Sequence, residues 1–415
     1  MTAQVAAVAE RPEPGPEALH AGALLPATLL AAGLLFPTSV AGNISNGLYA
    51  LHQALFCLIA AWIVVKYDAL GSTLQVWNAV LVVVWCVAAS VLSPFQDLAL
   101  GALGVYALMA ILLSLDVAHL ETPASPRILR ALTLVLLVAA AGVVIGNSFV
   151  VELLIGNYGL AYPELLPTMM TFRKPVFTFA SHSLAGYFYF LLFYLNLESY
   201  VARRRRSDLA LAVGCVIGGA LLTSMTAAVL MPVALVLLFI RSGRARLPLF
   251  GALALGLGGA AWIFRGELAQ LAAVTNFLAT FESSGSGFSG RFGQGGNLLN
   301  NFELIRSMPL RPIGLSFSST VFYGDSGPVE YLLRGSWLLL GAVYGGLALF
   351  LWRNLLSRRH ALIIFAVTVA FEIGMTVMTY HRFVFLLPFA VMHLNHLTRS
   401  AGGGTAAASI PAAVR

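Results

Sequence analysis

The sequence contains unusually little charge. Asp, Glu, Lys and Arg make up 10% of its 415 residues, whereas soluble domains carry about 25%. Hydrophobic residues make up 59%, and the mean hydropathy is +0.87. Such a chain cannot cover a water-exposed surface with polar side chains, which excludes an ordinary soluble fold. Its apolar stretches are close to the roughly 20 residues that a helix needs to cross a bilayer, which predicts an all-α integral membrane protein and not a membrane β-barrel.

Cysteine and metal-binding patterns are also scarce. The three cysteines, Cys57, Cys86 and Cys215, fall within apolar stretches, so we expect them to pack in the core and form neither disulfides nor a metal site. The sequence has no H-E-x-x-H and no acidic D-x-D motif. It therefore predicts no metal site and no cofactor.

Both chain ends are predicted to be cytoplasmic tails. Residues 1–21 carry several glutamates and no basic segment, unlike a cleaved signal peptide. Residues 400–415 are rich in glycine and alanine, and we expect them to be disordered. Between the tails, residues 22–399 form one polytopic membrane domain with about twelve predicted transmembrane helices. The predicted spans are 22–41, 48–66, 73–92, 97–115, 129–148, 175–199, 208–222, 225–240, 247–264, 330–352, 361–379 and 383–397.

The distribution of Lys and Arg sets the predicted orientation. The runs "RRRR" at 203–206, "RSGRAR" at 241–246 and "RNLLSRRH" at 353–360 fall on one side of the predicted helices. The positive-inside rule makes that side the cytoplasm, so the net charge of +7 reflects topology and does not indicate a nucleic-acid partner. The opposite face, the periplasm beside a bacterial inner membrane, receives loops at about 149–174 and 265–329, the longer one between spans nine and ten.

A glycine-rich motif in the longer loop has the spacing of a nucleotide-binding fingerprint. "SSGSGFSGRFGQGG" at 283–296 places Gly285, Gly287 and Gly290 at G-x-G-x-x-G spacing. A dinucleotide fold requires a strand before this motif and a helix after it, and the sequence predicts neither. The predicted compartment also holds no ATP or NAD. We therefore interpret the motif as a flexible linker that carries Arg291.

The predicted periplasmic face nevertheless carries a set of cations. Arginine presents a fixed fork of donors that matches phosphate oxygens, so this set favours an anionic partner such as a lipid phosphate or pyrophosphate. The alternatives are snorkelling and local ion pairs, and for Arg334 the partner would be Glu330, four residues earlier. The candidate pyrophosphate-binding residues are Arg173, Lys174, Arg291, Arg306, Arg311, Arg334 and Arg382, with Arg265 on the same face.

Three more polar residues lie at predicted membrane depth. His182 lies about two turns into span six, His381 lies at the outer end of span eleven beside Arg382, and Glu372 lies near the middle of that span. Ionisable groups inside a membrane usually face a cavity or a partner. The histidines are therefore candidate catalytic residues, with a hydrogen bond between helices as the alternative. Glu372 would either face a functional cavity or pair with a neighbouring helix.

Four segments, in this order along residues 160–352, resemble the O-antigen polymerase and ligase superfamily (Wzy and WaaL), which includes exopolysaccharide polymerases. They are "FRKPVFTFASHSLAGYFYF", "ALLTSMTAAVLMPVALVLL", the loop from Gly290 and Arg291 to "SMPLRPIGLSF", and "YGDSGPVEYLLRGSWLLLGAVYGGL". The hairpin segment has Ser224, Met225 and Thr226 where the family has a Ser-Arg pair. Asp325 and Ser326 stand where ligases tend to have a His-Asn pair, which favours a polymerase.

The resemblance implies a metal-independent glycosyltransferase at the periplasmic face. The donor would be an oligosaccharide on polyprenyl (undecaprenyl) pyrophosphate, the acceptor a second lipid-linked glycan, and a chain-length regulator is a further expected partner. The expected catalytic residues are His182, His381, Asp325 and Arg291, with the cations stabilising the leaving pyrophosphate. The alternatives are an O-antigen ligase that uses lipid A core, and a transporter or flippase of anionic lipid-linked glycans.

Overall fold

The computed structural model describes residues 24–36, 47–93, 100–120, 122–159, 164–177, 179, 181–222, 225–242, 297–307, 312–315 and 326–407. Across these residues the regular structure consists of helices, apart from one isolated bridge between Leu70 and Leu115. The all-α expectation is confirmed. Within the described ranges, three helices are long and apolar enough to cross a membrane, and several shorter apolar helices accompany them, as in an α-helical membrane protein.

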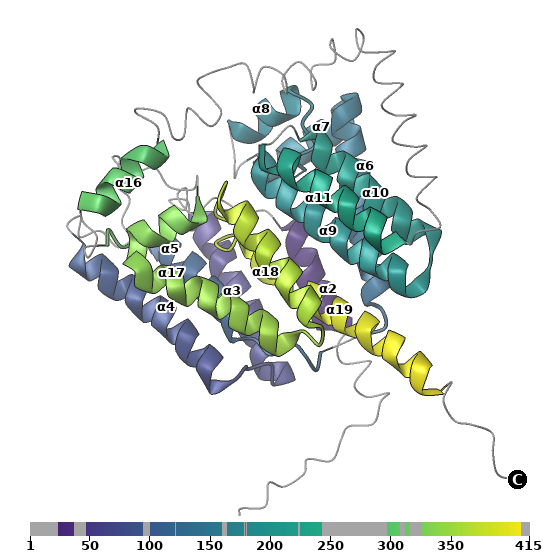
Figure 1. Cartoon of the computed structure of the whole chain (residues 1–415). Helices are drawn as coiled ribbons and strands as arrows, with labels where there is room; N and C mark the ends of the chain where they lie inside the picture. Colours follow the sequence, from purple (N-terminus) through teal and green to yellow (C-terminus); the bar gives the residue numbers. More distant parts are fainter. Residues whose placement is uncertain are drawn as a thin grey trace, which may run out of the picture.

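The helices fall into two groups that are joined through the middle of the bundle (Figure 1). The first group is α3 (Gly47–Tyr67), α4 (Thr73–Leu92), α5 (Leu100–Ser114) and α17 (Gly327–Asn354). The second group is α6 (Ser125–Ile145), α9 (His182–Arg203), α10 (Arg206–Leu221) and α11 (Met225–Ser242). Between them lie α2 (Leu24–Ala32) with its 3-10 extension η1 (Gly33–Leu35), α18 (Arg358–Glu372) and α19 (His381–Ala407). The short helices α7 (Ser148–Tyr158), α8 (Leu165–Thr171) and α16 (Asn297–Ser307) complete the described structure.

Burial separates the central helices from the peripheral ones. Every residue of α9 from 183 to 200 is buried, as is every residue of α19 from 381 to 395. On α4, by contrast, large apolar side chains such as Trp77 (66% exposed) and Val91 (74% exposed) point outward. Apolar side chains this exposed on a peripheral helix are expected where the surrounding solvent is lipid.

Some helix boundaries follow local sequence signals. Ser72 and Gln75 form a capping box at the start of α4. Gly146 ends α6 with a left-handed φ of 74°, a conformation that glycine adopts without strain. Predicted spans three, seven and eight correspond closely to α4, α10 and α11, so dividing the stretch 208–240 into two helices is confirmed.

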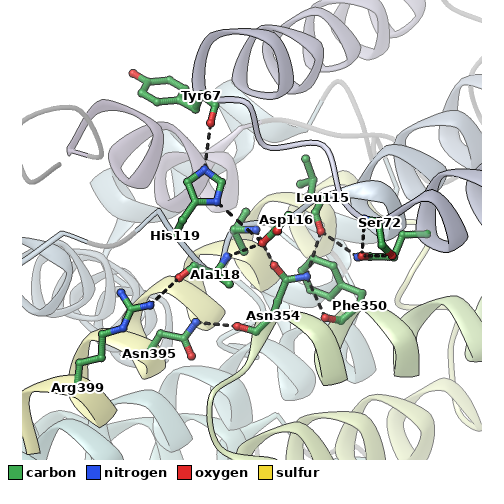
Figure 2. A network of polar contacts seen from close by, with 12 residues as sticks. Tyr67, Ser72, Leu115, Asp116, Ala118, His119, Phe350, Asn354, Asn395 and Arg399 are labelled. Carbon is green, nitrogen blue, oxygen red and sulfur yellow. Dashed lines mark hydrogen bonds and ion pairs between the residues drawn. The ribbon is translucent and has the colours of Figure 1, made fainter. Parts of the chain in front are cut away.

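Hydrogen bonds gather the loops at one end of the bundle, which we call the inner end because it carries the basic runs. Asn354, at the end of α17, accepts from the N–H of Val117 (2.6 Å) and donates to the carbonyls of Leu115 and Phe350 (Figure 2). Asn395 of α19 donates to the Asn354 carbonyl at 2.7 Å. These side chains satisfy backbone groups that the helix ends leave without intrahelical partners.

The opposite end, the outer end, differs from the expectation in four places. The predicted loop 149–174 contains the helices α7 and α8, and α16 lies within the predicted loop 265–329. Span six was predicted to begin at residue 175, but the structure begins α9 at His182, after a non-helical segment. Span eleven was predicted to run to residue 379, but α18 ends at Glu372. Predicted span nine, residues 247–264, lies outside the described residues.

Candidate functional site at the outer end

The non-helical segment 373–380, between α18 and α19, is the centre of the outer end. Most of it is buried. The N–H groups of its first residues still bond to carbonyls of the last turn of α18, and the buried backbone groups beyond them need other partners. The Glu372 carboxylate supplies two of them, because its Oε1 accepts from the N–H groups of Val377 and Met378, both at 2.6 Å. The hydroxyl of Thr376 donates to Glu330 Oε2 at 2.7 Å. Two buried glutamates therefore hold the segment in place.

Glu372 also joins α18 to α17. Its oxygens accept from the hydroxyls of Tyr331 (3.2 Å) and Tyr344 (3.1 Å). A Cβ added at Gly327, the first residue of α17, would overlap Glu372 Oε2, so this close approach requires glycine. The pairing with a neighbouring helix that the sequence suggested as an alternative for Glu372 is confirmed.

Arg334 forms the local ion pair that its spacing suggested. Its Nε donates to Glu330 Oε1 at 2.9 Å, and its Nη1 donates to the Gly314 carbonyl at 3.3 Å. The side chains of Arg334 and Glu330 are 1% and 3% exposed. A buried pair of this kind is usually held by further hydrogen bonds, which Gly314 and Thr376 supply here.

A break in α17 follows directly after Arg334. Gly335 and Ser336 have non-helical dihedral angles, and Ser336 has φ 58° and ψ −166°, a region that only glycine enters readily. The break frees three carbonyls, and each has a donor from another part of the chain. The N–H of Ile313 donates to Leu333 (2.8 Å), that of Gly314 to Arg334 (3.1 Å), and Trp85 Nε1 to Gly335 (2.6 Å).

His381 and Arg382 lie in the first turn of α19, not at a turn between two spans as expected. Both are buried. The His381 ring stacks on Phe56 at 4.3 Å between centroids. The Arg382 guanidinium donates from Nε and Nη2 to the Phe36 carbonyl, at 3.1 and 2.9 Å, and lies 4.8 Å from the centroid of Phe179. Arg382 therefore ties α19 to the end of η1 and to the segment before α9.

His182 is the first residue of α9 and lies beside the segment 373–380. Its neighbour Ser181 is the N-cap, whose hydroxyl accepts from the N–H of Leu184 and donates to Met375 Sδ at 2.8 Å. The expectation that His182 lies two turns inside a helix is wrong, because α9 begins at His182. The residues 175–177 before it are non-helical, and the Tyr189 hydroxyl holds them by donating to the Pro175 carbonyl. His182 thus lies at a helix N-terminus, where backbone N–H groups favour anions.

Arg173 and Lys174 lie on the same path, nearer the surface. Arg173 is exposed and has a left-handed φ of 53°. A Cβ added at Gly146 would lie 3.3 Å from its guanidinium, so this side chain lies over the end of α6. Burial lowers the pKa of Lys174, because a charged ammonium is poorly solvated there. These two cations are more accessible than Arg334 and Arg382.

The structure thus brings together some of the predicted site residues. His182, His381, Arg334 and Arg382 surround the segment 373–380, whereas Arg306 is exposed on α16, which packs on α17 through Leu298, Val329 and Leu333. Arg265, Arg291, Arg311 and Asp325 lie outside the described residues, as does the glycine-rich motif.

Sequence reasoning missed Tyr331, Tyr344 and Thr376, which complete the polar network. The break in α17 separates the two tyrosines, so regular helical spacing would not place them on one face. The Gly335–Ser336 pair was the available signal, because such pairs often kink helices.

Among the described residues, no group of three His, Cys, Asp or Glu side chains could hold a metal ion. An H-x-x-H spacing does occur at His393 and His396, but the His393 ring contacts the hydroxyls of Ser199 (2.7 Å) and Ser125 (3.3 Å) between helices. Comparison with family models, curated proteins and solved structures found no match to this chain. The resemblance to the O-antigen polymerase and ligase superfamily therefore depends on the quoted motifs alone.

Proposed function

We propose that this protein is an inner-membrane glycosyltransferase that polymerises lipid-pyrophosphate-linked oligosaccharide repeat units at the periplasmic face. The observation that carries the proposal is the segment from Arg173 to the start of α9. It presents Arg173 and Lys174 near the surface and places His182 at a helix N-terminus, next to the buried segment 373–380. This segment is also the first of the motifs that resemble the superfamily.

The proposed reaction assigns a role to each of these residues. The acceptor hydroxyl attacks the anomeric carbon of the donor, and the bond from that carbon to the pyrophosphate oxygen breaks. The electron pair leaves with the lipid pyrophosphate, whose growing negative charge Arg173 and Lys174 would stabilise, together with Arg291 and Arg311. The hydroxyl proton goes to a base, for which His182 is the leading candidate because imidazole is the side chain that serves most often as a general base.

The buried cations have a different proposed role. Arg334 and Arg382 already contact Glu330 and backbone carbonyls, so we assign them to holding the outer end in shape. His381 would act through packing on Phe56. This assignment divides the predicted pyrophosphate-binding set into accessible residues that meet the substrate and buried residues that position them.

The test is a polymerisation assay with the purified full chain in nanodiscs. The substrate is the lipid-pyrophosphate-linked repeat unit, with no nucleotide and no added metal, and products are resolved on a gel. We expect a ladder from the wild type and at least tenfold slower ladder growth for Arg173→Gln, Lys174→Gln and His182→Gln. Arg353→Gln, an exposed arginine at the inner end, is the matched control and should behave as wild type. Absence of a wild-type ladder would contradict the polymerase, and transfer to lipid A core instead would indicate a ligase.

A transporter of anionic lipid-linked glycans is the second candidate, and the broken elements favour it. Discontinuous helices are typical of transporter substrate sites, and the chain has two such interruptions, the break in α17 and the segment 373–380. A flux assay with the same lipid in proteoliposomes separates the two candidates. Movement of the lipid between leaflets without formation of new glycosidic bonds would favour the transporter.

A further inference from the structure

A hollow of ≈ 530 Å³ opens at the inner end, far along the helices from the outer-end site. It lies where the ends of α9 and α11, the start of α18 and the later part of α19 come together. Its polar lining is Glu198, Arg241, Ser357, Arg359, His360 and Thr398, beside an aliphatic wall.

Two arginines in this hollow share one carboxylate. Arg241 donates to both oxygens of Glu198, from Nε to Oε1 at 3.1 Å and from Nη2 to Oε2 at 2.8 Å. Arg359 Nη2 donates to the same Oε2 at 3.0 Å. Among the described residues, Glu198 is the one carboxylate in ion-pair contact with either guanidinium. The group therefore has one positive charge in excess.

The exposures show which side of this group faces the hollow. The Glu198 side chain is 7% exposed, whereas those of Arg241 and Arg359 are 27% and 45% exposed. The Glu198 carboxylate thus lies at the floor of the hollow. It fixes the two guanidinium groups, and some of their N–H donors remain accessible from the hollow. A guanidinium has five N–H donors, and these contacts use two from Arg241 and one from Arg359. Next to them, His360 is held by a 2.6 Å hydrogen bond between its Nδ1 and the Tyr194 hydroxyl.

We propose that this hollow binds a phosphate group, with Arg359 and Arg241 as its cationic ligands. A phosphate monoanion would balance the excess charge, and fixed guanidinium forks match its oxygens. The Ser357 hydroxyl provides a further donor. Two sources share this chemistry: the headgroup of an anionic phospholipid and free inorganic phosphate. The headgroup is the favoured source, because Val201, Leu397 and Ala401 line the same hollow and basic pockets between helices at the cytoplasmic surface suit such lipids. This site does not depend on the proposed glycosyl transfer.

The test measures binding of two probes to the full chain. Phosphatidylglycerol is titrated against phosphatidylcholine in detergent and followed by native mass spectrometry. In parallel, inorganic phosphate is added to protein in phosphatidylcholine nanodiscs, with sodium chloride at equal ionic strength as the reference, and thermal unfolding is followed. The variant is Arg359→Gln, which leaves the two-point contact between Arg241 and Glu198 in place. The control is Arg353→Gln, which removes the same charge from an exposed position at the same end.

We expect one phosphatidylglycerol to bind the wild type and the Arg353→Gln control, and to bind Arg359→Gln about tenfold more weakly, as expected for a lost hydrogen bond to a charged group. Stabilisation by inorganic phosphate that Arg359→Gln abolishes would support the site and identify free phosphate as the source. Equal binding of both probes to wild type and Arg359→Gln would overturn the proposal. Failure of both probes to bind the wild type would overturn it as well.

Discussion

Replacing Glu372 with alanine is expected to destabilise the protein by about 4 kcal/mol. The carboxylate is fully buried and accepts from two backbone N–H groups and two tyrosine hydroxyls. Truncation leaves the N–H groups of Val377 and Met378 without an acceptor, at a cost of about 1–3 kcal/mol each. The hydroxyls of Tyr331 and Tyr344 can rotate, so they contribute less. The remainder comes from the cavity left by the lost side-chain atoms.

Two milder substitutions make this prediction quantitative. Glu372→Gln keeps the shape and one carbonyl oxygen for the backbone donors, so we expect a loss of about 1–2 kcal/mol. Tyr344→Phe removes one donor and should cost about 1 kcal/mol. Unfolding of the full chain in detergent, followed by tryptophan fluorescence, gives the free energies, and Glu152→Ala, an exposed glutamate on α7, is the control. Wild-type stability of Glu372→Ala, or equal losses for alanine and glutamine, would refute the reasoning.

Four further predictions use the same unfolding measurement. Arg334→Met should cost about 3–5 kcal/mol because it leaves Glu330 as an unpaired buried charge, and adding Glu330→Gln should recover much of the loss; no recovery would contradict the ion-pair account. Asn354→Ala should cost about 2–3 kcal/mol because it leaves the inner-end backbone groups unpaired, and an unchanged midpoint would show that water replaces the amide. Ser336→Gly should stabilise by about 1 kcal/mol because glycine relieves the unfavourable dihedral angles, and a loss would contradict that strain. Burial lowers the pKa of Lys174, so Lys174→Met should preserve or raise stability while it slows glycosyl transfer. Loss of both stability and transfer would indicate a structural role for Lys174.

Helix positions were predictable where apolar periodicity alone decides them. The boundaries of α4, α10 and α11 agree closely with the predicted spans because polar and small residues flank each apolar stretch. The start of α9 and the end of α18 were not predictable in this way. Residues 175–177 and 373–380 are largely apolar, and side-chain hydrogen bonds from Tyr189 and Glu372 hold them in non-helical paths.

The candidate site was predictable in composition but not in geometry. The spacing of Glu330 and Arg334 correctly predicts their ion pair, because the spacing is local. Hydropathy gave no signal that Arg382 would contact the Phe36 carbonyl from the far end of the chain. Nor did it indicate that Ser181 would place His182 beside Met375.

The break in α17 and the non-helical segment 373–380 explain why ionisable residues occur within these apolar stretches. In a lipid environment a broken helix leaves backbone groups that water cannot satisfy, so each break requires polar side chains from elsewhere in the fold. Trp85 and Glu372 meet that requirement at the two breaks described here. An ionisable residue in an apolar span is therefore evidence for a break before it is evidence for catalysis. By this criterion Glu372 and Arg334 belong to the scaffold. Arg173 and Lys174 make no such bonds among the described contacts, which is why we propose them, and not the buried arginines, as the residues that meet the substrate.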